Sequence, residues 1–189
     1  SKVIYYIHWN YELAAFPQPA DRQLARKLIE EGVDAVVGNH PHLSQGGENY
    51  RGKPILYSLG NWFFPPRRFG PVSLNFSSEP TQQVAVEIDF SEGREISVLF
   101  HWLRFDSEAE RLTYERTESW DGETLSGLTP FSGISDADYI GWYKKHRKKR
   151  YSLPVYRDYR LRVENWIKDQ VVKLRQQLIW LLVQTKLKK

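Results

Sequence analysis

The sequence predicts an α/β protein in which a β–α–β unit is followed by an antiparallel hairpin and a C-terminal amphipathic helical extension. Three observations support this fold class. A β-branched and aromatic run near the N-terminus precedes a segment with helical spacing and a second apolar run. Two later stretches alternate apolar and polar residues around a turn, which is typical of a hairpin. The last part of the chain repeats apolar residues at helical spacing.

The β–α–β unit occupies the N-terminal part of the chain. The run VIYYIHW, residues 3–9, has the composition of a buried strand and carries His8 near its end. The segment QPADRQLARKLIEEG has Pro19 near its start and Gly32 at its end, as a helix does. The run VDAVVG, residues 33–38, is the second strand. Because the crossover makes these strands parallel, their carboxyl ends should meet at one sheet edge, where α/β proteins place their ligand sites.

The remaining elements follow in order along the chain. GKPILYSLGNWFF is expected to be a strand that enters a turn at Gly60 and Asn61. QVAVEIDF and EISVLFHWLRF predict an antiparallel hairpin around the turn SEGR. Residues 107–138 mix charged and small residues and are expected to form strand ends and loops. The chain from Val155 onward predicts one long amphipathic helix.

The composition excludes several kinds of site. The chain of 189 residues has no cysteine, so a disulfide framework, a thiol nucleophile and a cysteine zinc site are excluded. It also has no run of about 18 apolar residues, so no membrane-spanning helix is predicted. The sequence enters a strand pattern almost at once and has no initiator methionine. We therefore expect it to be a cut piece of a longer chain.

The charge is divided unevenly along the chain. Residues 144–189 hold 15 Lys and Arg against 3 Asp and Glu, a net charge of +12, and the other residues hold 12 against 20, a net charge of −8. The run YKKHRKKRY, with Trp142 before it, is either a solvated surface or a segment that binds an anionic membrane. Nucleic acid is a weaker alternative, because no recognised binding module accompanies the run. LIWLLV is too short to span a bilayer and fits docking on the head, on a partner or at a membrane interface.

The five histidines include a close pair, His40 and His42. Pro41 biases His40 toward extended geometry, in which residues two apart project to the same side. His8 should reach the same sheet edge from the neighbouring strand. The pair is therefore either a set of metal ligands completed by His8 or two loop histidines without a metal. His101 lies within a predicted strand and is expected to be a packed or edge residue.

Three segments resemble a known family. IHWNYE at 7–12, GVDAVVGNHPHLSQ at 32–45 and ENYRGKPILYSLGNWFF at 48–64 resemble the C-terminal half of the CapA family. These bacterial capsule and poly-γ-glutamate biosynthesis proteins belong to the calcineurin-like metallophosphoesterase superfamily. The resemblance implies that residues 1–138 form part of a metallophosphoesterase-like α/β sandwich, and it leaves residues 139–189 as a basic helical extension.

The resemblance also implies a function and a site. It implies a two-metal hydrolase centre that acts on a phosphoester or envelope polymer, with divalent Mn, Zn or Fe, and a membrane-associated place in the bacterial cell envelope. His8, His40 and His42 match the family's metal-ligating histidines. Glu12 matches a family glutamate, and Glu12 and Asn61 are candidates for supporting the ligands or the substrate. No residue is assigned as catalytic.

The family's carboxylate-bearing motifs lie N-terminal to the strand where this sequence begins. Two dications about 3.5 Å apart repel by roughly 19 kcal/mol at an effective dielectric of about 20, and neutral imidazoles do not offset that charge. We therefore expect an incomplete metal site and an isolated chain with little or no activity, unless an N-terminal half or a partner chain supplies the carboxylates. The alternative is a non-catalytic remnant or interaction module that uses its basic tail. In either case, the sheet is expected to leave an edge and an apolar face exposed.

Overall fold

The computed structural model describes residues 1–61, 67–69, 72–74, 82–91, 95–106, 109–147 and 153–184. Some predicted features therefore lie outside the described residues. These are Trp62 to Phe64 of the strand after Gly52, most of the SEGR turn, and residues 148–151 of the basic run.

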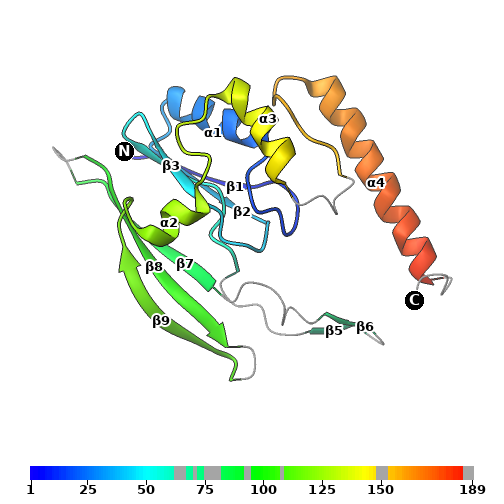
Figure 1. The fold of residues 1–189 in the computed structure, drawn as a ribbon, viewed down its shortest axis with the longest axis horizontal. Helices are drawn as coiled ribbons and strands as arrows, with labels where there is room; N and C mark the ends of the chain where they lie inside the picture. The colour runs from blue at the N-terminus through cyan, green and yellow to red at the C-terminus, as the bar shows by residue number, and fades with distance from the viewer. Residues whose placement is uncertain are drawn as a thin grey trace.

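A mixed four-stranded sheet forms the centre of the molecule (Figure 1). Its strands are β1 (Ile4–His8), β2 (Ala35–Asn39), β4 (Lys53–Leu56) and β3 (Gly47–Tyr50), in the order β1-β2-β4-β3. β1, β2 and β4 are parallel neighbours, and β3 runs antiparallel to β4. Helix α1 (Pro19–Glu30) connects β1 to β2. The predicted α/β class and its β–α–β unit are confirmed, whereas the short strand β3 was not among the predicted elements.

β1 is an exposed edge strand, so the prediction of a buried strand is wrong. Ile4 is 52% exposed and Tyr6 is 62% exposed, whereas Ala35 to Gly38 of β2 are buried. Within the described residues β1 pairs with β2 and with no strand on its other side. β1 therefore exposes apolar side chains to solvent. The expectation of an exposed edge and an exposed apolar face is confirmed.

The two faces of the sheet pack against different layers. Val36 and Ile55 face a core that contains Ala25 and Ile29 of α1 and the ring of Phe131. Val37 and Leu56, which alternate with them along the strands, face a second core formed with the antiparallel sheet and α2. The second core contains Val84, Val98, Phe100, Trp102 and Leu125. The sheet thus lies between a helical layer and a second sheet.

The second sheet contains β7 (Gln82–Asp89), β8 (Ser97–Asp106) and β9 (Arg111–Glu118). The predicted hairpin is confirmed as β7 and β8. The prediction of strand ends and loops over 107–138 is wrong in that this stretch contains a full strand, β9, and helix α2 (Glu123–Leu128). β9 is rich in charged residues, which pair across the strands as Arg104 does with Glu115 and so hide the usual strand pattern. A short antiparallel pair, β5 (Arg67–Phe69) and β6 (Val72–Leu74), precedes this sheet.

Helix α3 (Asp136–His146) closes the helical layer. Its Tyr139 and Tyr143 are buried in the first core, and Tyr139 donates a hydrogen bond to the Pro17 carbonyl oxygen at 2.8 Å. The division predicted after residue 138 falls inside this helix.

Buried charge ties α3 to α1 and β3. Arg22 is 0% exposed, and its Nε lies 2.6 Å from Glu48 Oε1. The same guanidinium donates to the Ile134 carbonyl oxygen at 2.8 Å and lies 4.6 Å from the centre of the Tyr139 ring. Arg26 and Asp136 complete the cluster with an ion pair of 3.0 Å. Because every charge in this cluster has an opposite partner, the arginine can be buried without a large penalty.

The C-terminal helix α4 (Arg162–Gln184) starts later than predicted. Residues 153–158 form no helix and instead lie across α1, where the Ala20 amide donates to the Tyr156 carbonyl oxygen at 3.0 Å. Figure 1 shows α4 running along one side of the molecule. Within the described residues, no helix is both long and apolar enough to cross a membrane.

Candidate metal centre at the carboxyl edge of the sheet

The predicted histidines gather at the carboxyl ends of β1 and β2. His8 is the last residue of β1 and pairs in register with Asn39, the last residue of β2. His40 follows directly, and its ring centroid lies 4.3 Å from that of His8. The rings of His40 and His42 are 6.0 Å apart. The parallel pairing of the two strands therefore brings together residues that are more than thirty positions apart in the sequence.

The backbone that carries the pair is not extended, so that prediction is wrong. His40 has φ 106° and His42 has φ 60°, both in the left-handed region that side chains other than glycine rarely adopt. The Asn39 Oδ1 atom accepts a hydrogen bond from the His40 amide at 2.8 Å, and the Leu13 amide donates to the Pro41 carbonyl oxygen at 2.7 Å. These bonds hold a tight turn. Such backbone strain, about 1–3 kcal/mol for each residue, concentrates at functional sites.

The buried side chain of Trp9 packs against the end of β2, directly before the turn. The Trp9 indole N–H donates to the Tyr57 carbonyl oxygen at 2.8 Å and lies directly across Gly38. A methyl group at Gly38 would collide with both the indole and that carbonyl oxygen. Glycine is therefore required at this position for the ends of β1, β2 and β4 to approach one another.

The hydrogen bonds of Asn61 determine the tautomer of His42. The Asn61 side-chain amide donates to the His42 carbonyl oxygen at 3.3 Å, so its Oδ1 atom faces the His42 Nδ1 atom, at 2.6 Å. Since Oδ1 can only accept, Nδ1 carries a proton, and Nε2 is the nitrogen that remains for a metal ion. A histidine that binds a metal through one nitrogen commonly donates its other N–H to an oxygen in this way. The sequence-predicted supporting residue Asn61 therefore contacts a candidate ligand directly.

The electrostatic surroundings of His40 favour its neutral form. Partial burial and the nearby His8 lower the pKa of His40, while the carboxylate of Glu12 acts in the opposite direction and raises it. A neutral imidazole is the form that coordinates a metal. Glu12 itself is exposed, and its influence on this site is through its charge.

The ring positions can be compared with the needs of a metal ion. A ligating histidine nitrogen lies about 2.0–2.1 Å from zinc, so two ring centroids that share one ion lie at most roughly 6 Å apart. The His8–His40 and His40–His42 separations of 4.3 and 6.0 Å both meet this limit. Taken as a set, the described residues contain no group of three or more His, Cys, Asp or Glu side chains placed to hold a metal ion. The three histidines thus come together as two neighbouring pairs, His8 with His40 and His40 with His42.

A cavity of about 480 Å³ adjoins His40 on the side of α4. Its lining includes Trp9, Gln18, Asp21 and Tyr156. Within the described residues, the buried Gln18 Nε2 and Asp21 Oδ2 atoms have no hydrogen-bond partner. Burial raises the pKa of Asp21 to about 7. The sequence analysis did not select Gln18 or Asp21, although their place at the N-terminus of α1, the next element after β1, puts them at the same sheet edge.

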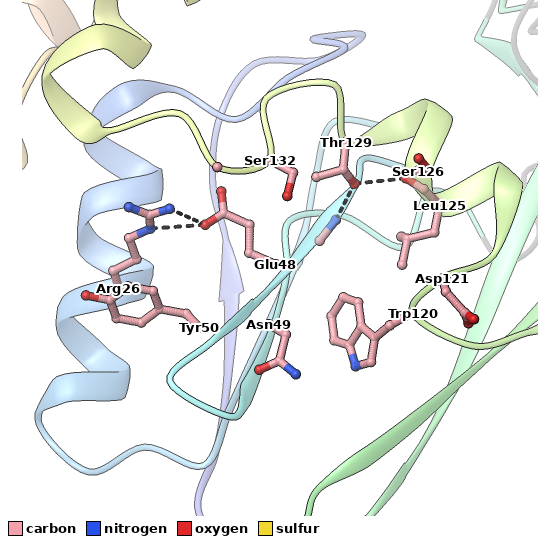
Figure 2. A pocket seen from close by; sticks show the side chains of 12 residues that line it. Arg26, Glu48, Asn49, Tyr50, Trp120, Asp121, Leu125, Ser126, Thr129 and Ser132 are labelled. Carbon is pink, nitrogen blue, oxygen red and sulfur yellow. Dashed lines mark hydrogen bonds and ion pairs between the residues drawn. The ribbon is translucent and has the colours of Figure 1, made fainter.

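A second open cavity, of about 470 Å³, lies at the opposite edge of the sheet along β3 (Figure 2). Glu48 and Arg26 form one wall, and Trp120 and Thr129 line the other side. Its polar groups are largely engaged with one another, since Arg26 is paired with Glu48 and the Gly47 amide donates to Thr129 Oγ1 at 3.2 Å. This cavity contains no histidine and is separate from the histidine edge.

Comparison with known proteins finds similarity in the segment that carries the histidine edge. The family described as bacterial capsule synthesis protein PGA_cap matches residues 1–66, which include all three site histidines. Residues 1–66 are thus similar to the PGA_cap family, and this match covers about a third of the chain. The match to PGA_cap ends before β7, so the antiparallel sheet, α3 and α4 lie outside it.

Curated relatives match stretches of similar length. The PGA biosynthesis protein CapA of Bacillus subtilis is 44% identical over 62 residues, which are 33% of this chain and 16% of that relative. The capsule biosynthesis protein CapA of Bacillus anthracis is 39% identical over 62 residues, 33% of this chain and 15% of the relative. A probable polyglutamine synthesis accessory protein of Mycobacterium tuberculosis, strain H37Rv, is 40% identical over 55 residues, 29% of this chain and 14% of the relative. The chain thus spans less than one fifth of the length of these relatives.

Proposed function

We propose that residues 1–66 contribute the histidine side of a divalent-metal centre to a protein of capsule or poly-γ-glutamate biosynthesis in the bacterial cell envelope. The observation that carries the proposal is the approach of His8, His40 and His42 within the segment that matches CapA proteins. The strained turn, the fixed tautomer of His42 and the neutral state favoured at His40 support it. Each of these features suits an imidazole nitrogen that donates its lone pair to a metal ion.

The residues of this chain have distinct roles in the proposed site. His8, His40 and His42 present imidazole nitrogens, and Asn61 holds the Nδ1 proton of His42 so that Nε2 is the coordinating atom. The metal ions, when bound, would polarise a phosphoester or related bond and lower the pKa of a bound water. The bridging carboxylates come from an N-terminal half or a partner chain in this proposal. The cavity beside His40 would receive the substrate, a phosphoester or an envelope polymer, and Gln18 and Asp21 would offer it a hydrogen-bond donor and acceptor.

A chimeric protein tests this proposal. Residues 3–64 of this chain would replace the matching segment of the Bacillus subtilis CapA protein, and the poly-γ-glutamate released by a strain lacking its own copy would be measured. We expect the chimera to restore polymer production. His40→Asn in the chimera should abolish it, because asparagine tolerates the left-handed backbone but does not replace the imidazole.

The matched control is Asn49→Ala, an exposed position on β3 at the other edge of the sheet. It should leave polymer production unchanged. Equal production by the His40→Asn and Asn49→Ala chimeras would refute a metal role for His40.

That result would favour a second candidate function, a non-catalytic interaction module. The observation in its favour is the net charge of +12 on residues 144–189, a stretch that lies outside the PGA_cap match. Such a module would keep the sheet as a scaffold and would act through its basic tail.

A further inference from the structure

Helix α4 presents an apolar stripe to solvent. Val163, Ile167, Val171, Leu174 and Leu178 follow one another at intervals of three or four residues, so they lie on one side of the helix. Their exposed fractions range from 51% to 73%. Exposed apolar residues scattered singly are ordinary, whereas a continuous stripe of large side chains marks an interaction site.

The opposite side of α4 faces the rest of the protein. Lys168 donates a hydrogen bond to the Val155 carbonyl oxygen at 2.7 Å, and Asn165 donates to the Asp158 carbonyl oxygen at 2.9 Å. Tyr156 donates to Asp169 at 2.6 Å. Polar residues therefore attach the helix to the body of the protein. This attachment turns the apolar stripe outward.

The residues beside the stripe indicate what covers it. Trp166 and Trp180 are each 61% exposed, and helical spacing places them on one flank together with the exposed Arg162 and Lys173. Leucines along one side, tryptophan at the boundary and Lys or Arg on the flanks are the pattern of a helix that lies in a membrane interface. Residues 144–189 as a whole hold 15 Lys and Arg against 3 Asp and Glu, which suits an anionic surface.

The charges argue against a second copy of this chain as the occupant. The acidic residues of α4 are Glu164 and Asp169, and both are already engaged, Glu164 with Arg157 and Lys168, and Asp169 with Tyr156. A second α4 helix would therefore bring more positive charge to the flanks of the stripe and no acidic partner. The apolar positions from Ile167 to Leu178 also span fewer than the three or four heptads of a typical coiled coil.

We infer that α4 binds the surface of an anionic lipid bilayer through Val163, Ile167, Val171, Leu174 and Leu178. The helix lies in the plane of the interface, with its basic flanks at the lipid headgroups. The inference is independent of the proposed metal centre, because it rests on α4 and the tail. It has a consequence for that site, since residues on the inner side of α4 line the cavity beside His40. That cavity lies about one helix diameter, roughly 10 Å, from the bilayer surface.

Vesicle co-sedimentation of the full 189-residue chain tests the inference. The probes are vesicles of phosphatidylcholine alone and of equal parts phosphatidylcholine and phosphatidylglycerol. We expect the chain to sediment with the anionic vesicles at least about ten-fold more strongly than with the neutral ones. Binding should weaken as salt is raised above about 0.1 M, where charge interactions are screened within roughly 10 Å.

Two neutral double variants separate the stripe from the rest of the helix. Leu174→Ser with Leu178→Ser removes apolar area from the stripe and should weaken binding by about ten-fold or more. Gln170→Ser with Gln177→Ser makes the same loss of helix propensity at polar positions and should bind as the original chain does. Circular dichroism checks that both variants keep the same helix content.

Arg162→Gln supplies an arm that does not depend on the leucines. This variant should lose part of its preference for anionic vesicles while keeping its folded spectrum. The inference is overturned if the chain does not sediment with anionic vesicles, or if the leucine variant binds them as well as the glutamine variant. It is also overturned if sedimentation equilibrium shows that the original chain is a dimer and the leucine variant a monomer, while both bind vesicles equally well.

Discussion

Helices α1 and α4 differ in the direction in which they turn their apolar residues. In α1, Ala25 and Ile29 are buried against β2 and β4, and the arginine on the same helix is buried by its ion pair with Glu48. In α4, Val163, Val171, Leu174 and Leu178 face solvent, and polar residues make the attachment. The two sequences have similar amphipathic spacing. The spacing of apolar residues therefore shows only that a helix has an apolar side. Whether that side faces the core or the solvent depends on what the polar residues of the helix bind.

The largest expected effect comes from removing the buried charge of α1. Arg22→Ala leaves Glu48 and Asp136 without their buried partner and should lower the free energy of unfolding by about 3–5 kcal/mol. Urea denaturation followed by circular dichroism measures it. The control Arg160→Ala breaks an ion pair in which the arginine side chain is 72% exposed, and it should change stability by less than about 1 kcal/mol. Equal losses of stability in the two variants would show that the buried ion pair of α1 contributes no more than an exposed ion pair.

A matched pair of truncations compares the apolar sides directly. Ile29→Ala in α1 opens a cavity in the core and should cost about 2–4 kcal/mol. Leu174→Ala in α4 removes an exposed side chain, in a residue type with nearly the same helix propensity, and should change stability by less than about 0.5 kcal/mol. Thermal and urea unfolding of both variants give the values. A cost above 2 kcal/mol for Leu174→Ala would mean that the α4 stripe is packed in solution.

The start of α1 should make stability depend on pH. Burial raises the pKa of Asp21 from 3.8 to about 7, so the folded state binds a proton that the unfolded state has already lost between these values. Stability from this group is therefore full at low pH and is lost as pH rises from about 4 to about 7, by about 4 kcal/mol for a shift of this size. In the Asp21→Asn variant, the midpoint of unfolding should change less with pH across this range. An unchanged pH slope in that variant would show that Asp21 is not the group responsible.

The N-terminal third could be predicted from the sequence to a large extent. The β-branched run, the Pro19 start and the Gly32 stop gave the β–α–β unit, and the placement of His8 and His40 followed from the parallel pairing. The turn itself could not be predicted, because the Pro41 rule describes the local preference of one residue. Hydrogen bonds from Asn39 and Leu13, one of them from a distant loop, override that preference.

Other errors have a common physical origin. β1 looks like a buried strand because its residues are apolar, yet burial depends on which neighbours are present, and a single strand does not specify them. β9 was missed because cross-strand ion pairs replace the apolar alternation that marks a strand. Gln18 and Asp21 were missed since their significance lies in being buried beside the cavity, which no local pattern reveals.

Calorimetric titration of Zn²⁺ and Mn²⁺ into the full chain and two histidine variants measures directly whether the histidine edge binds a divalent metal ion. We expect one weakly bound ion in the original chain, loss of that binding in His40→Asn, and unchanged binding in His101→Asn. His101 is the matched control because it lies on β8, where its Nδ1 atom hydrogen-bonds to Thr117 at 2.8 Å, away from the histidine edge. Asn61→Ala should weaken the same binding by about 10–100-fold, since the tautomer of His42 is then no longer fixed. Absence of metal binding in the original chain, or equal binding by the His40→Asn and His101→Asn variants, would contradict the account.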